Sequence, residues 1–203
     1  MPRATASETR RRLVDAATEF LRMRGVGDLS LRELASAIGT SHRMLLYHFG
    51  SKDGLLVEVA RAVEQRQRDE VTALFEGFDP ANGEELNRSV WRRLRSPDLA
   101  PLERLFFELY GRGLGGGQEA SRLLEGVVDS WVATALPALE EAGVPASRAP
   151  VYARLAVAVT RGLLLDVLAT GEEDAVDQAY ELYLTTMARS LPRPAGPGRR
   201  GSA

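Results

Sequence analysis

The sequence predicts an all-α protein of about nine helices. Apolar residues recur at helical spacing along most of the 203 residues, and glycine and proline residues separate these segments. No segment has the alternating pattern of a half-buried strand. No apolar run approaches the roughly 18 residues of a membrane span, and no apolar stretch follows the N-terminal arginines. We therefore expect a cytoplasmic protein without a membrane segment.

The first helix is predicted by an apolar stripe and by signals at both of its ends. Thr5 and Glu8 have the spacing of a capping box before it, and Gly25 and Gly27 follow it. The stripe has the spacing i, i+3, i+4, i+7, i+8 and comprises Leu13, Ala16, Ala17, Phe20 and Leu21.

Three further segments follow closely. Ser30 and Glu33 again fit a capping box, Gly39 ends the helix that they open, and a short helix then runs over 41–49. Ser51 caps the next helix. The expected buried residues are Leu31, Leu34, Ala35 and Ile38 in the first of these helices and Leu55, Leu56, Val59 and Val63 in the last.

The remaining chain predicts five longer helices, near 83–95, 99–113, 119–142, 147–170 and 173–190. The breaks between helices fall at Asp79-Pro80, at Ser96-Pro97, at the glycines of 111–117, at 143–145 and at Gly171. Residues 192–203 have no apolar periodicity and are expected to be disordered. We expect one domain over 1–56, a larger one over 57–191 whose first helix starts near 52, and the tail 192–203.

Charge and cysteine content narrow the function classes. Residues 1–52 carry nine Lys and Arg against five Asp and Glu, whereas residues 53–191 carry fourteen against twenty-three. This asymmetry favours an N-terminal part that faces a polyanion, although solvated helices often carry similar charge. The chain has no cysteine, which excludes disulfides, thiolate metal sites and a cysteine nucleophile.

Ala35, Gly39 and Leu45 have the spacing of a helix-turn-helix unit. The small residue lets two helices cross closely, the glycine permits the turn, and the leucine fills the gap between them. An ordinary helical corner shares this glycine and is the alternative. On a helical wheel of the 41–49 segment, Leu45 and Phe49 point inward and Arg43 and Tyr47 point outward, a pattern typical of a helix that reads DNA in the major groove.

The stretch LRELASAIGTSHRMLLYHFGSKDGLL resembles the DNA-binding region of the tetracycline-repressor-like (TetR) family of bacterial transcription factors. The resemblance covers roughly residues 8–60. The positions that carry it are Ala16-Ala17, Phe20, Leu34-Ala35, Gly39, Ser41, His48-Phe49 and Ser51-Lys52.

The resemblance implies that residues 41–44 begin a recognition helix and that His48 and Lys52 contact phosphates. This chain departs from the family pattern at two positions. Thr40 replaces an apolar turn residue, and Leu46 replaces a tyrosine. Tyr47, one place later, is therefore the candidate for the phosphate contact of that tyrosine. The expected DNA-binding residues are Ser30, Ser41, His42, Arg43, Met44, Leu46, Tyr47, His48 and Lys52.

Other site chemistries fit the sequence poorly. His42 and His48, the two histidines of the chain, are six residues apart and point about 120° away from each other on one helix, so they do not chelate a metal. Gly111, Gly113 and Gly116 match G-x-G-x-x-G, but a helical pattern precedes them where a dinucleotide site needs a strand. No nucleophile motif is present, and we expect neither an enzyme nor a bound cofactor.

The segments 147–170 and 173–190 carry more apolar residues than one core-facing stripe requires. The family resemblance implies a homodimer through these last two helices, and a buried helix of a monomer is the alternative. The resemblance also implies a small-molecule pocket in the C-terminal part. Candidate pocket residues are Trp91, Phe106, Phe107, Tyr110, Trp131 and Tyr152, with Thr160 as a polar anchor.

Together these features predict a one-component transcriptional regulator, a repressor that binds a near-palindromic DNA operator as a homodimer. The family resemblance implies that an unidentified small ligand, expected to be apolar or aromatic, releases it from DNA. Two alternatives stay open at this point: a sequence-tolerant DNA-binding protein without an inducer, and a helical enzyme or small-molecule-binding protein.

Overall fold

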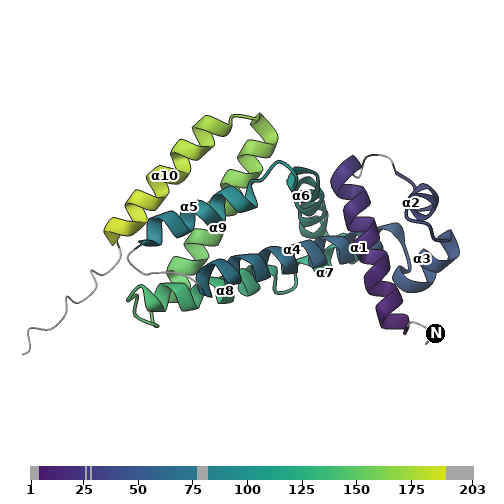
Figure 1. Cartoon of the computed structure of the whole chain (residues 1–203), viewed down its shortest axis with the longest axis horizontal. Helices are drawn as coiled ribbons and strands as arrows, with labels where there is room; N and C mark the ends of the chain where they lie inside the picture. The colour runs from purple at the N-terminus through teal and green to yellow at the C-terminus, as the bar shows by residue number, and fades with distance from the viewer. Residues whose placement is uncertain (1–4, 26, 28, 77–81, 191–203) are drawn as a thin grey trace, which may run out of the picture. The chain divides into compact units, whose positions relative to one another are not determined.

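The computed structural model describes residues 5–25, 27, 29–76 and 82–190, and these residues form ten α-helices and no strand (Figure 1). The all-α prediction is therefore confirmed for the described part of the chain. The helix bounds are α1 Ala6–Arg24, α2 Leu31–Ala37, α3 His42–Phe49, α4 Lys52–Glu76, α5 Gly83–Leu94, α6 Ala100–Leu114, α7 Gln118–Leu124, α8 Val127–Glu141, α9 Ala149–Thr170 and α10 Glu173–Ser190.

The helices belong to two compact units. One unit combines the described residues up to 70 with 92–127, and the other combines 71–91 with the described residues from 128 onward. Helices α4 and α5 each contribute to both units. The first unit therefore contains α1, α2, α3, α6 and α7, and the second contains most of α8 together with α9 and α10.

Helix α1 begins at the predicted capping box. The Thr5 N–H donates to Glu8 Oε2 at 2.7 Å, and the Glu8 N–H donates to Thr5 Oγ1 at 3.2 Å. The predicted stripe is correct at Ala17 and Leu21, which are buried, but wrong at Ala16, which is exposed. The core contains Thr18 instead, because its hydroxyl donates to the Val14 carbonyl at 2.8 Å and so loses no hydrogen bond on burial.

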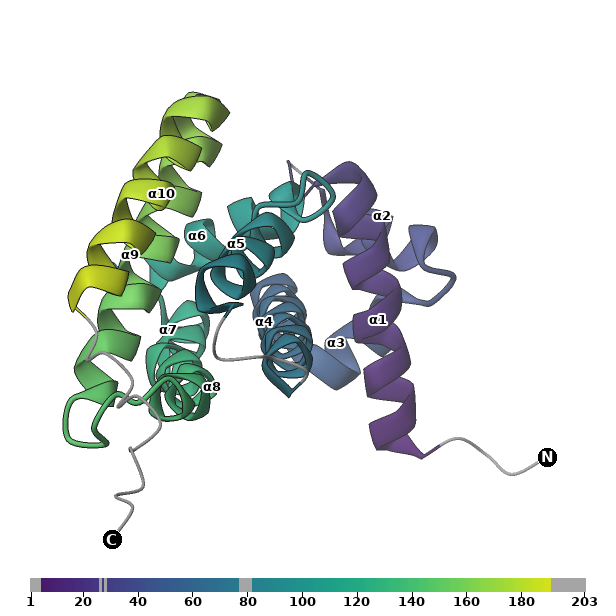
Figure 2. The same cartoon turned by 60° about the vertical axis from the view of Figure 1, so that its left-hand side comes forward.

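Helices α2 and α3 pack against each other and form the predicted helix-turn-helix (Figure 2). The Ser30 N–H donates to Glu33 Oε2 at 2.8 Å, and these capping hydrogen bonds hold the pKa of Glu33 below its usual value. Gly39 has φ +69°, a left-handed conformation that glycine adopts without strain, and it turns the chain after α2. Ala35 and Leu45 are buried, as the motif requires.

The glycine-rich segment 111–117 joins two helices and follows no strand. Gly111 and Gly113 lie inside α6, and Gly117 is the N-cap of α7. A Cβ atom on Gly113 would lie 2.9 Å from the Ala120 carbonyl oxygen, so glycine at this position lets α6 and α7 approach closely. The structure therefore confirms an interhelical connection here and not a strand–helix phosphate loop.

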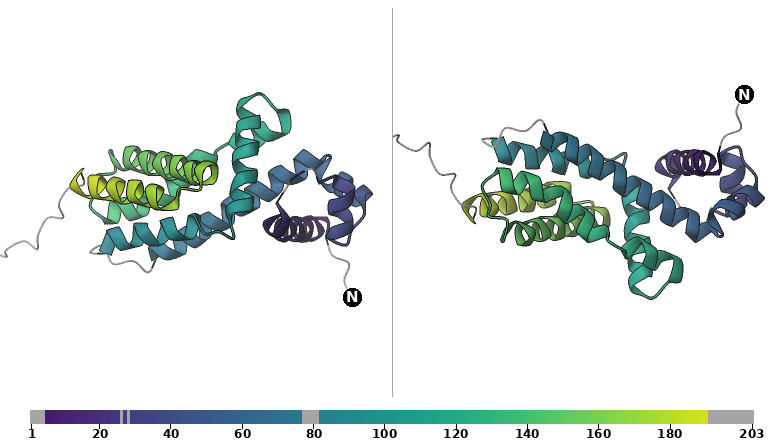
Figure 3. Two further views of the ribbon diagram at one scale, coloured as in Figure 1. Left: turned by 90° about the horizontal axis from the view of Figure 1, so that it is seen from above. Right: turned by 90° about the horizontal axis from the view of Figure 1, so that it is seen from below.

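In the second unit, α9 and α10 run alongside each other from a tight turn at Gly171, whose φ is +73° (Figures 1 and 3). Side chains of α5 pack against α10. The Trp91 ring stacks on Tyr180 at a centroid distance of 4.5 Å, and the Trp91 Nε1–H donates to Asp177 at 2.7 Å. Burial raises the pKa of the Tyr180 hydroxyl well above its usual value.

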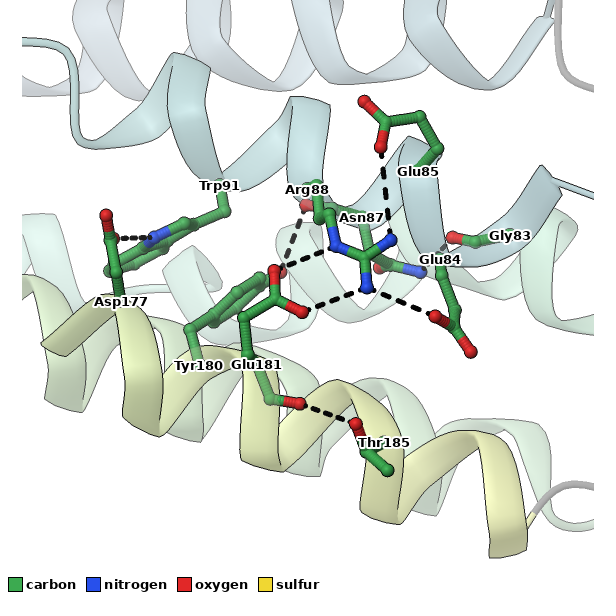
Figure 4. A network of polar contacts seen from close by, with 10 residues as sticks. All are labelled: Gly83, Glu84, Glu85, Asn87, Arg88, Trp91, Asp177, Tyr180, Glu181 and Thr185. Carbon is green, nitrogen blue, oxygen red and sulfur yellow. Dashed lines mark hydrogen bonds and ion pairs between the residues drawn. The ribbon is translucent and has the colours of Figure 1, made fainter. Parts of the chain in front are cut away.

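An arginine next to this stack joins the same two helices. Arg88 pairs with Glu181 on α10, at 2.8 Å from Nε to Oε1, and with Glu84 on its own helix at 3.1 Å (Figure 4). Its side chain is about one-third exposed, so solvent weakens these ion pairs and they orient the helices more than they stabilise them.

One predicted helix is divided in two. The segment expected over 119–142 forms α7 and α8, because Gly126 has φ +69° and interrupts the helical backbone. The predicted break at Asp79-Pro80 and the predicted disordered tail 192–203 lie outside the described residues. Among the described helices, none is both long enough and apolar enough to cross a membrane.

Candidate nucleic-acid interface

Helix α3 is anchored on one face and open to solvent on the other. Leu45 is completely buried and Phe49 is 9% exposed, whereas Tyr47 is 76%, Met44 40% and Leu46 39% exposed. Arg43 is also exposed and forms no ion pair with any described residue. The arrangement has the inward and outward sides that the helical wheel predicts, so the exposed side can meet a ligand without unfolding the core.

Polar groups stand at the beginnings of α2, α3 and α4. The Ser41 hydroxyl oxygen accepts the Met44 N–H at 3.1 Å and caps α3, and its own O–H remains able to donate to a phosphate oxygen. The Ser30 hydroxyl oxygen likewise accepts the Glu33 N–H and caps α2. Lys52 is the first residue of α4, whose N-terminal N–H groups favour a nearby anion.

The two histidines lie in different surroundings. Both are half-buried, with His42 at the first position of α3 and His48 in its last turn. The His48 ring contacts the Tyr47 ring edge-on, with centroids 5.0 Å apart. Tyr47 makes this contact while most of its side chain stays open to solvent.

Arg10 of α1 holds the end of α3, a role that the sequence patterns did not reveal. Its Nε–H donates to the His48 carbonyl oxygen at 3.5 Å, and its guanidinium lies over the Phe49 ring, 5.2 Å from the centroid. Its Nη1 also pairs with Glu58 of α4 at 2.7 Å. One arginine therefore joins α1, α3 and α4, and it satisfies a carbonyl that the end of a helix leaves unpaired.

The same part of α4 also meets α6 and α7. Arg112 of α6 forms an ion pair with Asp53, next to Lys52. Arg61 donates to the Arg122 carbonyl oxygen near the end of α7, and it lies 3.7 Å from Glu58. The recognition helix, α4 and the α6–α7 pair are thus connected by polar contacts within one compact unit.

The candidate pocket residues do not belong to one unit. Phe106, Phe107 and Tyr110 cluster on α6 in the first unit, where the Phe106 ring lies 5.3 Å from the Phe107 ring and 5.6 Å from the Tyr110 ring. The other four lie in the second unit. They are Trp91, Trp131, Tyr152 and Thr160.

Two of these four use their polar atoms inside the protein. Trp91 donates to Asp177, and the Tyr152 hydroxyl donates to the Ser190 carbonyl oxygen at 2.9 Å and accepts from Arg148 at 3.1 Å. Both side chains are buried. In this structure they therefore tie the helices of the second unit together. Trp131 and Thr160 are half-buried.

Comparison with known proteins identifies the anchored helix and its surroundings. Residues 13–59, which run from α1 into α4, match the family model described as "Bacterial regulatory proteins, tetR family". This part of the chain therefore has the sequence pattern of the DNA-binding region of TetR-family transcriptional regulators. The predicted resemblance is confirmed, and the helix-turn-helix is the DNA-binding part of this family.

Solved structures extend the similarity over most of the chain. A TetR-family member from Streptomyces coelicolor A3 is 29% identical, with a TM-score of 0.63 over 91% of this chain and 99% of that one. The multidrug binding protein EbrR, solved with imidazole, is 25% identical, with a TM-score of 0.65 over 96% of each chain. A transcriptional regulator from Rhodococcus sp. Rha1 shares the fold at 16% identity, with a TM-score of 0.72 over 92% of this chain and 100% of that one. The chain matches no curated protein.

Proposed function

We propose that this regulator is a repressor that binds a near-palindromic operator as a homodimer and leaves it when a small apolar or aromatic molecule binds. The observation that carries the proposal is α3, which is anchored by Leu45 and Phe49 and exposes Arg43, Met44, Leu46 and Tyr47 on its outer side. A short, rigidly anchored helix of this kind fits the width of a major groove.

The groups around α3 fit the phosphates on either side of a groove. Ser30, Ser41 and Lys52 stand at the beginnings of α2, α3 and α4, where backbone N–H groups and the helix dipole attract anions. His48 and Tyr47 stand near the other end of α3 and supply further donors. His42, at the first position of α3, faces the edge of the same groove. Phosphate contacts of this kind fix the position of a recognition helix but do not read sequence.

An exposed apolar stripe on α9 supports the homodimer. It recurs every three or four residues, the spacing of a helix–helix seam, and the neighbouring helix α10 exposes Leu182, which is 70% exposed. A symmetric pair of such faces would bury them in a four-helix contact between two copies. The exposed stripe on α9 consists of Val151, Leu155, Ala158, Gly162 and Leu165.

A small-molecule effector is supported by chemistry and by one relative. The aromatic rings of Phe106, Phe107 and Tyr110, and separately the half-buried ring of Trp131, offer the apolar surface that small ligands bind. EbrR, which is described as a multidrug binding protein, covers 96% of this chain. The effector would release DNA by binding better to a dimer whose recognition helices no longer fit both half-sites.

The proposal is tested by selecting fragments of the source genome that bind the purified protein. It predicts enriched fragments that share an inverted repeat with half-site centres about 34 Å, one helical turn, or slightly more apart. Transcription from an enriched promoter should fall when the protein is present and recover when the effector is added. Enrichment without a shared sequence would instead indicate a sequence-tolerant DNA-binding protein. Turnover of a small molecule by protein that does not bind DNA would indicate an enzyme or carrier.

A further inference from the structure

The outer face of the recognition helix is apolar at both of its edges. With about 100° per residue, the order around this face is Leu46, Arg43, Tyr47 and Met44, over about 160° of the helix surface. Met44 and Leu46 are 40% and 39% exposed, and neither side chain has an N–H or O–H to donate. Hydrogen-bonding side chains therefore occupy the middle of the face, and apolar ones border it.

This pattern restricts which bases can lie opposite the two apolar side chains. In the major groove, the one apolar feature of a base edge is the 5-methyl group of thymine, while guanine, adenine and cytosine present hydrogen-bonding atoms. An apolar side chain that covers such an atom removes its water and gives no hydrogen bond in return, which is unfavourable. An apolar side chain that covers the thymine methyl group instead buries apolar surface on both sides, which is favourable.

We propose that Met44 and Leu46 select thymine methyl groups on the two sides of the base pair that Arg43 contacts. The inference rests on the proposed function, in which α3 enters the major groove. Leu45 and Phe49 fix the rotation of α3, so Met44 and Leu46 cannot both turn away from the base edges. Arg43 between them has the fork of donors that suits guanine. Each half-site then contains a guanine contact flanked by thymines.

The test replaces thymine by deoxyuracil, which lacks only the methyl group. A preferred operator is first selected from random duplexes with the full-length protein. Each thymine of one half-site is then replaced in turn, and the dissociation constant is measured at fixed salt. Two positions are expected to weaken binding about fourfold each, the effect of withdrawing one buried methyl group. Other positions should change little.

Variants assign the two methyl contacts. Leu46→Ala should abolish the deoxyuracil effect at one of the two positions, and Met44→Ala should abolish it at the other. Arg43→Ala is the matched control on the same face, and it should bind more weakly but keep both deoxyuracil effects. Because Met44 and Leu46 are exposed, thermal unfolding of both variants should match that of the unaltered protein.

The outcomes separate this inference from the proposed function. If selection enriches no sequence, the proposed function is wrong and the inference falls with it. If a sequence is enriched but no deoxyuracil substitution weakens binding, the function stands and the inference is wrong. Deoxyuracil effects that persist in both alanine variants would also overturn it, because other residues would then read the methyl groups.

Discussion

Arg43 is the sole arginine of α3, and it stands in the middle of the exposed face without an ion pair to any described residue. Arginine donates two parallel hydrogen bonds to the O6 and N7 atoms of guanine, and such a contact discriminates against other bases by about 1–3 kcal/mol. The side chain therefore has the chemistry and the freedom to read one base pair in each half-site.

Arg43→Ala should abolish the preference at one position of each half-site and leave preferences elsewhere in place. Affinities for four duplexes that differ only at that position should converge, whereas for the unaltered protein they differ by about tenfold or more. Arg43→Lys is the control for charge, since lysine keeps the charge but loses the fork. Unchanged discrimination in Arg43→Ala would show that Arg43 does not read sequence.

Lys52 is expected to act on phosphate and not on a base. Lys52→Ala should weaken binding to operator and to random DNA by the same factor, and it should reduce the slope of log K against log salt by about 1. Titrations at several salt concentrations measure both quantities. Lys52→Arg keeps the charge and should leave the slope unchanged. A loss confined to the operator would assign Lys52 a role in base recognition instead.

At the scale of helices, local sequence signals predicted where several helices begin, but contacts between residues far apart in the sequence were not predicted. The capping boxes at Thr5 and Ser30 form as expected, because they depend on residues three positions apart. The contacts of Arg10 with His48 and Glu58 join residues 38 and 48 positions apart, and no periodic pattern encodes such a pair. The break at Gly126 was missed because a single glycine inside a helical pattern is often tolerated.

The capping box of α2 should contribute measurably to stability. Ser30→Ala removes the acceptor of the Glu33 N–H and should lower the free energy of unfolding by about 1 kcal/mol. Denaturant titration followed by circular dichroism measures the change. Ser36→Ala, on the exposed side of the same helix, is the control and should have little effect. Equal effects of the two substitutions would contradict a capping role for Ser30.

Arg10 should position α3 without touching DNA. Arg10→Ala should lower the ratio of operator to random-DNA affinity by about tenfold, the equivalent of one charge-assisted hydrogen bond. Arg10→Lys should lower the ratio of operator to random-DNA affinity nearly as much. One ammonium group cannot replace the contacts with His48, Phe49 and Glu58 together.

Arg12→Ala removes the same charge from an exposed position of α1 and is the matched control. It should leave the affinity ratio close to that of the unaltered protein. If Arg12→Ala and Arg10→Ala lowered the ratio equally, the effect would be one of net charge, and the positioning role of Arg10 would be refuted.

For the whole molecule, the sequence predicted the fold class and the family resemblance of residues 13–59, but not the grouping of helices. The spacing of Ala35, Gly39 and Leu45 and the glycine at 171 are local features, and they specify a helix-turn-helix and a helical hairpin. That α6 and α7 join the DNA-binding helices in one compact unit depends on contacts such as Arg112 with Asp53, which only the folded chain brings together. The separation of the aromatic pocket candidates follows from the same grouping.

A charged residue in the apolar stripe should separate the proposed dimer. Leu182→Glu would bury an unpaired carboxylate between two copies, so the protein should sediment as a monomer and lose most of its operator affinity. Ala188→Glu adds the same charge to an exposed position about 120° away on α10 and should remain dimeric. A Leu182→Glu protein that stays dimeric would place the interface elsewhere.

The most direct test of the account is the ratio of two dissociation constants, one for the selected operator and one for a scrambled duplex of equal length and composition. Both are measured with the full-length protein at physiological salt, since salt changes the two values differently. A regulator that reads sequence through α3 should bind the operator at least about a thousandfold more tightly. Equal affinity for the two duplexes would contradict the account.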